Sequence, residues 1–76
     1  MERIVQTVSA YDSVDRAVII KVYHRVSGCY AIYVNGDFYS TVEMQNEIEE
    51  EIGHIFRMCG FRTCFDFDKH ESEVTQ

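Results

Sequence analysis

Hydrophobic and polar residues alternate along the first half of the chain, a pattern typical of β-strands. Residues 17–25 are rich in β-branched side chains and place Val18, Ile20 and Val22 on one face. Residues 3–9 alternate more weakly, and a polar turn sequence follows them. These two patterns predict strands that each turn one apolar face toward a core.

Two turn signals extend this series of strands into an antiparallel meander. A Ser-Gly pair at residues 27–28 precedes an apolar run over residues 29–34. An Asn-Gly pair at residues 35–36 then precedes a short run over residues 37–39, and Asn-Gly is the strongest short-range signal for a hairpin.

The register of this second hairpin has two solutions. A two-residue loop would pair Val34 with Asp37, whereas a three-residue loop would pair Tyr33 with Asp37. We prefer the second because it gives the sheet a single face that can cover the core. That register would place Tyr30, Ile32 and Phe38 on the inner face of the sheet. Tyr33 and Tyr39 would then lie on the outer face.

One helix is predicted between Ser40 and Gly60. Ser40 and Glu43 have the spacing of a capping box, and Gly60 stands where a left-handed C-terminal cap is expected. Apolar residues recur between them at helical spacing: Met44, Ile48, Ile52, Ile55 and Cys59. This face is expected to pack on the sheet.

Phenylalanines alternate with polar residues over residues 61–67 and predict a final strand. The fold class expected is therefore α+β, a small two-layer domain with an antiparallel sheet of about four strands and one amphipathic helix on one face, in the order β-β-β-α-β. Residues 1–68 would form this single domain, and residues 69–76 a flexible acidic tail.

Composition supports a small folded domain. The chain has 76 residues, of which 46% are hydrophobic, and this is too apolar for an intrinsically disordered protein. No apolar run approaches the roughly 20 residues of a membrane span, and the N-terminus does not resemble a signal peptide. Three cysteines, an odd number, do not suggest a disulfide framework. We therefore expect a cytoplasmic protein that does not bind membranes.

Charge is distributed unevenly along the chain. Residues 1–39 contain four basic and four acidic residues, whereas residues 40–76 contain three and nine, so the second part carries the whole net charge of −6. A surface of one sign attracts a protein with a basic surface and repels anionic polymers. With seven basic residues against thirteen acidic ones, direct nucleic-acid binding is not expected.

The glutamates of the predicted helix have two explanations. On a helical wheel Glu43, Glu47 and Glu50 lie opposite the apolar face, as on an ordinary solvated helix that favours acidic residues near its N-terminus. Alternatively, they form a recognition surface. Like charges four residues apart cost roughly a few tenths of a kcal/mol, and no lysine compensates for them here.

Other candidates for partner binding lie on the strands. The sheet face not covered by the helix would expose Tyr33 and Tyr39 together with Tyr23, and it could be solvated, bound to a partner or buried in a homodimer. Asp66 and Asp68 alternate onto one side of the last strand. The complete candidate set for partner binding is Glu43, Glu47, Glu50, Tyr33, Tyr39, Asp66 and Asp68.

Catalytic and metal-binding signals are weak. The chain has no glycine-rich phosphate loop, no serine elbow and no two-histidine zinc helix, and its paired carboxylates lie on an exposed helix. We therefore predict no enzyme, no cofactor and no metal. The alternative is a small ligand-binding or zinc-binding regulatory domain that uses the tyrosine face or the soft ligands: His24, Cys29, Cys59 and Cys64.

The sequence therefore favours a small acidic protein-binding module, an inhibitor or adaptor that docks on a basic surface. In size, acidity and tyrosine content the chain resembles phage-encoded inhibitors of bacterial defence such as anti-CRISPR proteins. No motif is shared residue by residue. The resemblance implies a partner whose basic groove normally holds nucleic acid.

Overall fold

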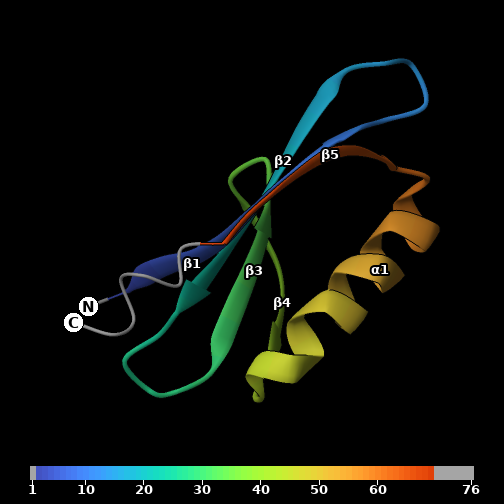
Figure 1. The fold of residues 1–76 in the computed structure, drawn as a ribbon. Helices are drawn as coiled ribbons and strands as arrows, with labels where there is room; N and C mark the ends of the chain where they lie inside the picture. The colour runs from blue at the N-terminus through green and yellow to red at the C-terminus, as the bar shows by residue number, and fades with distance from the viewer. Residues whose placement is uncertain (1, 70–76) are drawn as a thin grey trace.

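The computed structural model describes residues 2–69, and the side chains of residues 2–62 (Figure 1). Five antiparallel strands form one sheet in the order β4-β3-β2-β1-β5. The strands are β1 (Arg3–Tyr11), β2 (Ala17–His24), β3 (Tyr30–Val34), β4 (Asp37–Val42) and β5 (Arg62–Lys69). Between β4 and β5 lie a short 3₁₀ helix, η1 (Gln45–Glu47), and the helix α1 (Ile48–Cys59).

The α+β class is confirmed, with one more strand than the expected order. The chain runs β-β-β-β-α-β, because the short run after the Asn-Gly turn is a full edge strand. The first four strands are sequential neighbours, and α1 then carries the chain over one face of the sheet to the opposite edge (Figure 1). We expected the tail to begin at residue 69, but Lys69 is the last residue of β5. Residues 70–76 lie outside the described part of the chain.

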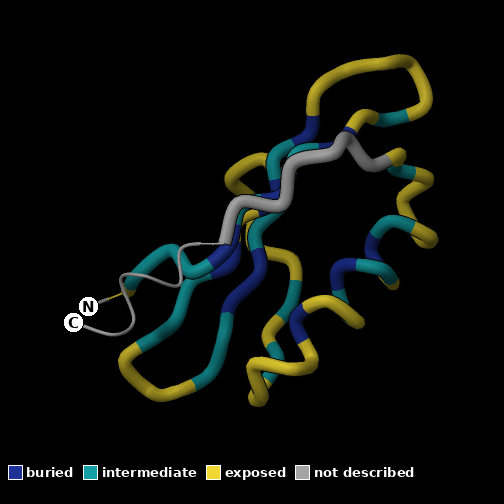
Figure 2. Tube along the Cα trace, in the orientation of Figure 1, coloured by how far each residue is buried: buried dark blue, intermediate teal, exposed yellow. Residues whose placement is uncertain are grey.

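The core lies between the sheet and α1. The inward face predicted for β2 is confirmed, and Figure 2 shows buried positions on the side of α1 that faces the sheet. The buried cluster comprises Val8, Ala10, Val18, Ile20, Val22, Ile32, Ile48, Ile52 and Ile55. Most of these side chains are β-branched, which suits both the pleated sheet and close packing against a helix.

The helix begins later than the sequence predicts. Ser40 lies inside β4, since Thr41 and Val42 still pair with Ala31 and Tyr30 of β3. Strand pairing therefore overrides the local capping signal. The Ser40 hydroxyl instead donates a hydrogen bond to the Glu51 carboxylate at 3.0 Å, which joins the edge strand to α1.

Glu47 takes the role that we assigned to Glu43. Its Oε1 atom accepts hydrogen bonds from the backbone amides of Glu43, at 3.2 Å, and Met44, at 3.1 Å. Because the first amides of a helical segment have no partner within the helix, this carboxylate satisfies groups that would otherwise depend on water. Met44 precedes η1 in an extended conformation and is 58% exposed, so it does not join the core.

The C-terminal end of α1 follows the prediction. Gly60 has φ +72°, and the amide of Phe61 donates to the carbonyl of Phe56 at 3.0 Å. The rings of Phe56 and Phe61 meet edge to face with centroids 6.2 Å apart. A left-handed cap and an apolar contact across it are the usual way to end a helix at glycine. Cys59, expected in the core, is exposed.

The hairpin between β3 and β4 has the two-residue loop that we did not prefer. Val34 pairs with Asp37, and Asn35 and Gly36 both have positive φ values, +51° and +86°. These angles are those of a type I′ turn, whose twist matches that of the strands. Asn35 also fixes the turn to β2, because it donates its amide to the carbonyl of Ile19 at 2.8 Å and its Oδ1 accepts from the amide of Ile19 at 2.9 Å.

The short turn, followed by a β-bulge, sets which side chains of β4 face outward. Ile32 pairs with Ser40 and Tyr33 pairs with Phe38, so Tyr39 is an extra residue. Phe38 therefore lies beside Tyr33 on the face away from α1, with ring centroids 5.7 Å apart, and is 56% exposed. The prediction that Phe38 joins the core is wrong, because the shorter loop reverses its side of the sheet.

The turn between β1 and β2 is organised by one carboxylate. Asp12 Oδ1 accepts from the amides of Val14, at 3.0 Å, and Arg16, at 2.9 Å, and Oδ2 accepts from the Arg16 guanidinium. The hydrogen bond from the Arg16 amide is the main reason that the pKa of Asp12 is lowered from its ordinary value of 3.8.

We predict that Asp12 makes the free energy of unfolding depend on pH in acid. Because the folded pKa is lowered, the stabilisation is complete well above pH 3.8 and is lost as the pH falls through the folded pKa. The difference in stability between wild type and Asp12→Asn should therefore shrink on acidification, as measured by urea denaturation between neutral pH and pH values below the ordinary value. A constant difference would contradict this role.

Two positions of the predicted apolar helix face should respond differently to truncation. Ile52→Ala should lower the free energy of unfolding by about 3 kcal/mol, because it leaves a cavity under the helix. Met44→Ala should change it by less than about 0.5 kcal/mol, since that side chain is solvated. Urea denaturation measures both variants, and Ile52→Val, at about 1 kcal/mol, keeps the comparison possible if Ile52→Ala does not fold.

Candidate functional site

The three glutamates predicted for partner binding line one groove. It lies between the end of β4 and α1 and has a volume of about 580 Å³. Its lining residues are Thr41, Val42, Glu43, Glu47, Glu50, Glu51, His54 and Arg57. We call it the acidic groove. Four carboxylates and one guanidinium line it, so the groove has an excess of negative charge.

The carboxylates of the acidic groove differ in the hydrogen bonds that they accept. Glu47 accepts two backbone amides and Glu51 accepts the Ser40 hydroxyl, so both have structural roles. Glu43 and Glu50 are exposed, and no ion pair involves either carboxylate among the described residues. These two side chains are available to a partner without loss of an intramolecular contact.

Two charged residues of the groove, Glu51 and Arg57, were not among the residues predicted for partner binding. The sequence does not reveal the role of Glu51, because nothing in its spacing shows that β4 continues past Ser40 and lies beside the helix. Arg57 lies in the last turn of α1. It could have been found, since Glu50, His54 and Arg57 continue one row at helical spacing.

A second surface lies on the sheet face turned away from α1. There the Tyr33 ring meets Tyr23 and Phe38 edge to face, with centroids 5.3 Å and 5.7 Å away. The Arg25 guanidinium donates to the Tyr33 hydroxyl at 3.1 Å and lies over the Phe38 ring at 6.0 Å. Tyr39, predicted to share this face with Tyr33, is the bulge residue and makes no ring contact with the cluster among the described residues.

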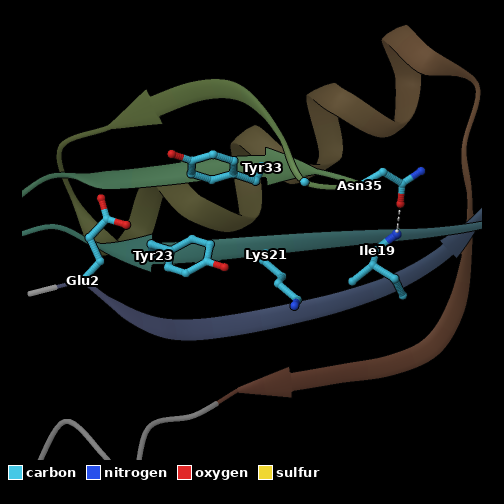
Figure 3. Close-up of a pocket in the computed structure, with 7 residues that line it drawn as sticks. Glu2, Ile19, Lys21, Tyr23, Tyr33 and Asn35 are labelled. Atoms are coloured by element: carbon cyan, nitrogen blue, oxygen red, sulfur yellow. Dashed lines mark hydrogen bonds between the residues drawn. The ribbon is translucent and has the colours of Figure 1, made fainter.

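This face contains an open pocket of about 560 Å³ (Figure 3). It is lined by Glu2, Ile19, Lys21, Tyr23, Tyr33, Asn35 and Gly36. We call it the tyrosine pocket. At one end Glu2 forms an ion pair with Arg25 at 3.4 Å, and at the other Asn35 is fixed to Ile19 by the turn.

Asp66 and Asp68 lie in β5, and their side chains are outside the described part of the structure. Asp68 pairs with Thr7 of β1. Because β5 and β4 are the two edges of the sheet, these residues do not share an edge with the acidic groove. The predicted set of binding residues is therefore divided among three places, of which only the groove brings several together.

Of the soft ligands considered for zinc, His24 and Cys59 lie far apart, and the side chain of Cys64 is outside the described part of the structure. His24 ends β2, where it stacks on Tyr30 with centroids 4.7 Å apart and shares a hydrogen bond with Arg3. Cys59 ends α1 at the opposite end of the molecule (Figure 1). Within residues 2–62, whose side chains are described, no three or more His, Cys, Asp or Glu side chains are grouped for a metal ion.

Comparisons with protein-family models, with curated proteins and with solved structures found no match to this chain. In the described part of the chain, α1 is too short and too polar to cross a membrane.

The different roles of Glu47 and Glu50 can be measured. Glu47→Ala should lower the free energy of unfolding by about 1 kcal/mol, because two amides at the start of the helical segment lose their acceptor. Glu50→Ala removes an equal charge from the same groove and should change stability by less than about 0.5 kcal/mol. Equal effects in urea denaturation would show that Glu47 does not cap the helix.

Proposed function

We propose that this chain is a small protein-binding module, an inhibitor or adaptor that docks its acidic groove on a basic surface of a partner protein. The observation that supports the proposal is the pair of carboxylates, Glu43 and Glu50, that form no ion pair within the described part of the chain, in a groove that already contains Glu47 and Glu51. A partner that brings cations would neutralise a charge cluster that the chain does not neutralise itself.

The position of the groove on α1 explains how the fold tolerates this cluster. Glu47 and Glu50 lie at the N-terminal end of the helix, where the macrodipole stabilises negative charge. Arg57, the basic residue of the groove, lies in the last turn. Negative charge is therefore concentrated at one end of the groove, and that end is where we place the partner's Lys or Arg side chains.

The shape of the groove favours an extended basic surface over a single cation. It follows α1 for several turns, from Glu43 before the helix to Arg57. Its other wall is the end of the edge strand β4. Charged side chains spaced along a helix can replace a row of phosphates in a basic groove that normally holds nucleic acid.

Such a role corresponds to that of the phage-encoded anti-CRISPR inhibitors, which the chain resembles in size and charge. The proposal assigns the protein to the cytoplasm, where the free thiols of Cys29 and Cys59 would remain reduced. It assigns no catalytic step to the chain, because the groove carboxylates are largely exposed and lack the desolvation that adjusts a catalytic acid.

Charge reversal in the groove should abolish partner binding. The full-length protein is used as bait in lysate from a bacterium that carries defence systems, beside a Glu43→Lys/Glu50→Lys bait. Proteins enriched on the wild type should be lost from the variant, and the affinity of the purified partner should fall by about a hundredfold. Raising the salt concentration should weaken the wild-type complex, because exposed charges are screened beyond about 8 Å at physiological ionic strength.

Glu49→Lys serves as the matched control, since Glu49 is exposed on the same helix and does not line the groove. It should retain the partner, and thermal unfolding of all three proteins should show that they fold. If the double variant captures the same proteins as the wild type, with the same affinity and salt dependence, the acidic groove is not the docking surface.

A further inference from the structure

We infer that the free edge of β4 binds an extended basic peptide of the partner, which adds to the sheet as a further strand and places alternate Lys or Arg side chains in the acidic groove. The inference rests on the proposed function and specifies which kind of segment docks there. It commits the site to a segment in strand conformation rather than to a basic helix.

Strand β4 has an open edge. Among the described residues it pairs only with β3, because it is the last strand on its side of the sheet. In such a strand every second residue turns its amide and carbonyl away from the neighbouring strand. These groups are a template on which an extended peptide can form main-chain hydrogen bonds.

The acidic groove runs along this edge. The Ser40 hydroxyl donates to the Glu51 carboxylate, and the Glu43 amide, further along the chain, donates to the Glu47 carboxylate. The end of β4 and the helical segment therefore lie side by side in opposite directions, with the groove between them (Figure 1). A peptide paired with β4 would have the outer side of α1 as its second wall.

The pleat of the sheet determines which side chains of an added strand enter the groove. Ser40 and Val42 lie on the α1 side of the sheet, because the residues with which they pair contribute to the core or pack against it: Ile32 and Tyr30. The side chains of an added strand alternate in the same way, and successive residues on one face are about 7 Å apart. Every second side chain of the peptide would therefore point into the groove.

The charge of the groove selects a basic peptide. Glu43 and Glu50 form no ion pair within the described part of the chain. Glu47 and Glu51 are four residues apart, which is about 6 Å along a helix and close to the repeat of a strand. Alternate Lys or Arg side chains can thus meet successive carboxylates. Main-chain pairing is largely independent of sequence, so these charges would provide the specificity.

The bulge at Tyr39 limits the part of β4 that a peptide can use. Beyond it, residues 40–42 pair regularly with β3, and this stretch contains the two strand residues that line the groove, Thr41 and Val42. A flexible peptide can pair with this stretch alone. The edge strand of a second folded copy would have to continue past the irregular position.

The probe is a capped peptide of about seven residues in which lysine alternates with threonine, titrated into the isotope-labelled full-length protein. It should bind with a dissociation constant below about 1 mM. Because an added strand covers the outer side of β4, hydrogen exchange of the outward-facing amides of residues 40–43 should slow by at least about tenfold.

Two modified peptides of equal charge test the strand geometry. One is methylated on the backbone nitrogens of its lysines and the other on those of its threonines, so each lacks the donors along one edge of the extended peptide. One of the two should bind at least about tenfold more weakly than the unmodified peptide, because its methyl groups face β4. The other should bind within about threefold of it.

Glu43→Gln/Glu50→Gln should weaken the unmodified peptide by about tenfold. Glu49→Gln is the matched control and should change the affinity by less than about twofold, since Glu49 does not line the groove. Absence of binding at millimolar peptide, equal effects of the two methylated peptides, or unchanged affinity in the double variant would overturn the inference. If the Glu43→Lys/Glu50→Lys bait nevertheless loses its partner, the proposed function stands and the docked surface is not an added strand.

Discussion

The two-residue turn at Asn35 and Gly36 determines where both candidate surfaces lie. By pairing Val34 with Asp37, it sets the register of β4, and the bulge that follows brings Ser40 opposite Ile32. The outward side chains of β3 and β4 then form one aromatic cluster, and β4 continues as far as Val42. The helical segment begins only after that point, so the position of the acidic groove follows from the same turn.

Elements that depend on a local sequence pattern could be predicted, whereas those that depend on the pairing of strands could not. The alternation in β2 and the left-handed cap at Gly60 are properties of short segments, and the structure agrees with both. Ser40 carried a strong capping signal, but its backbone is paired with β3, and strand pairing is a long-range interaction that a local motif does not reveal. The prediction for Phe38 was wrong for a related reason, since a shift of one residue in the hairpin register puts its side chain on the other face of the sheet.

Helical periodicity places Glu47 and Glu50 on one side of the helical segment, whereas Glu43 precedes η1 and reaches the same groove from the end of β4. The sequence could not show that Glu47 is also bound to the backbone, since the start of the helix was misplaced. The tyrosine pocket was less accessible to prediction. Tyr33 was expected on the open face, but Lys21 and Asn35 become its neighbours only through the register of three strands and a turn.

The bulge at Tyr39 has a consequence for how copies of this chain behave in a crowded solution. Strand β4 is an edge of the sheet and contains neither lysine nor proline, the residues that commonly protect such edges. Its unpaired side would offer a straight template to the edge of another molecule. A bulge bends the strand and interrupts the spacing of its backbone groups, so a second copy meets an irregular template. The extra residue in β4 thus limits edge-to-edge aggregation.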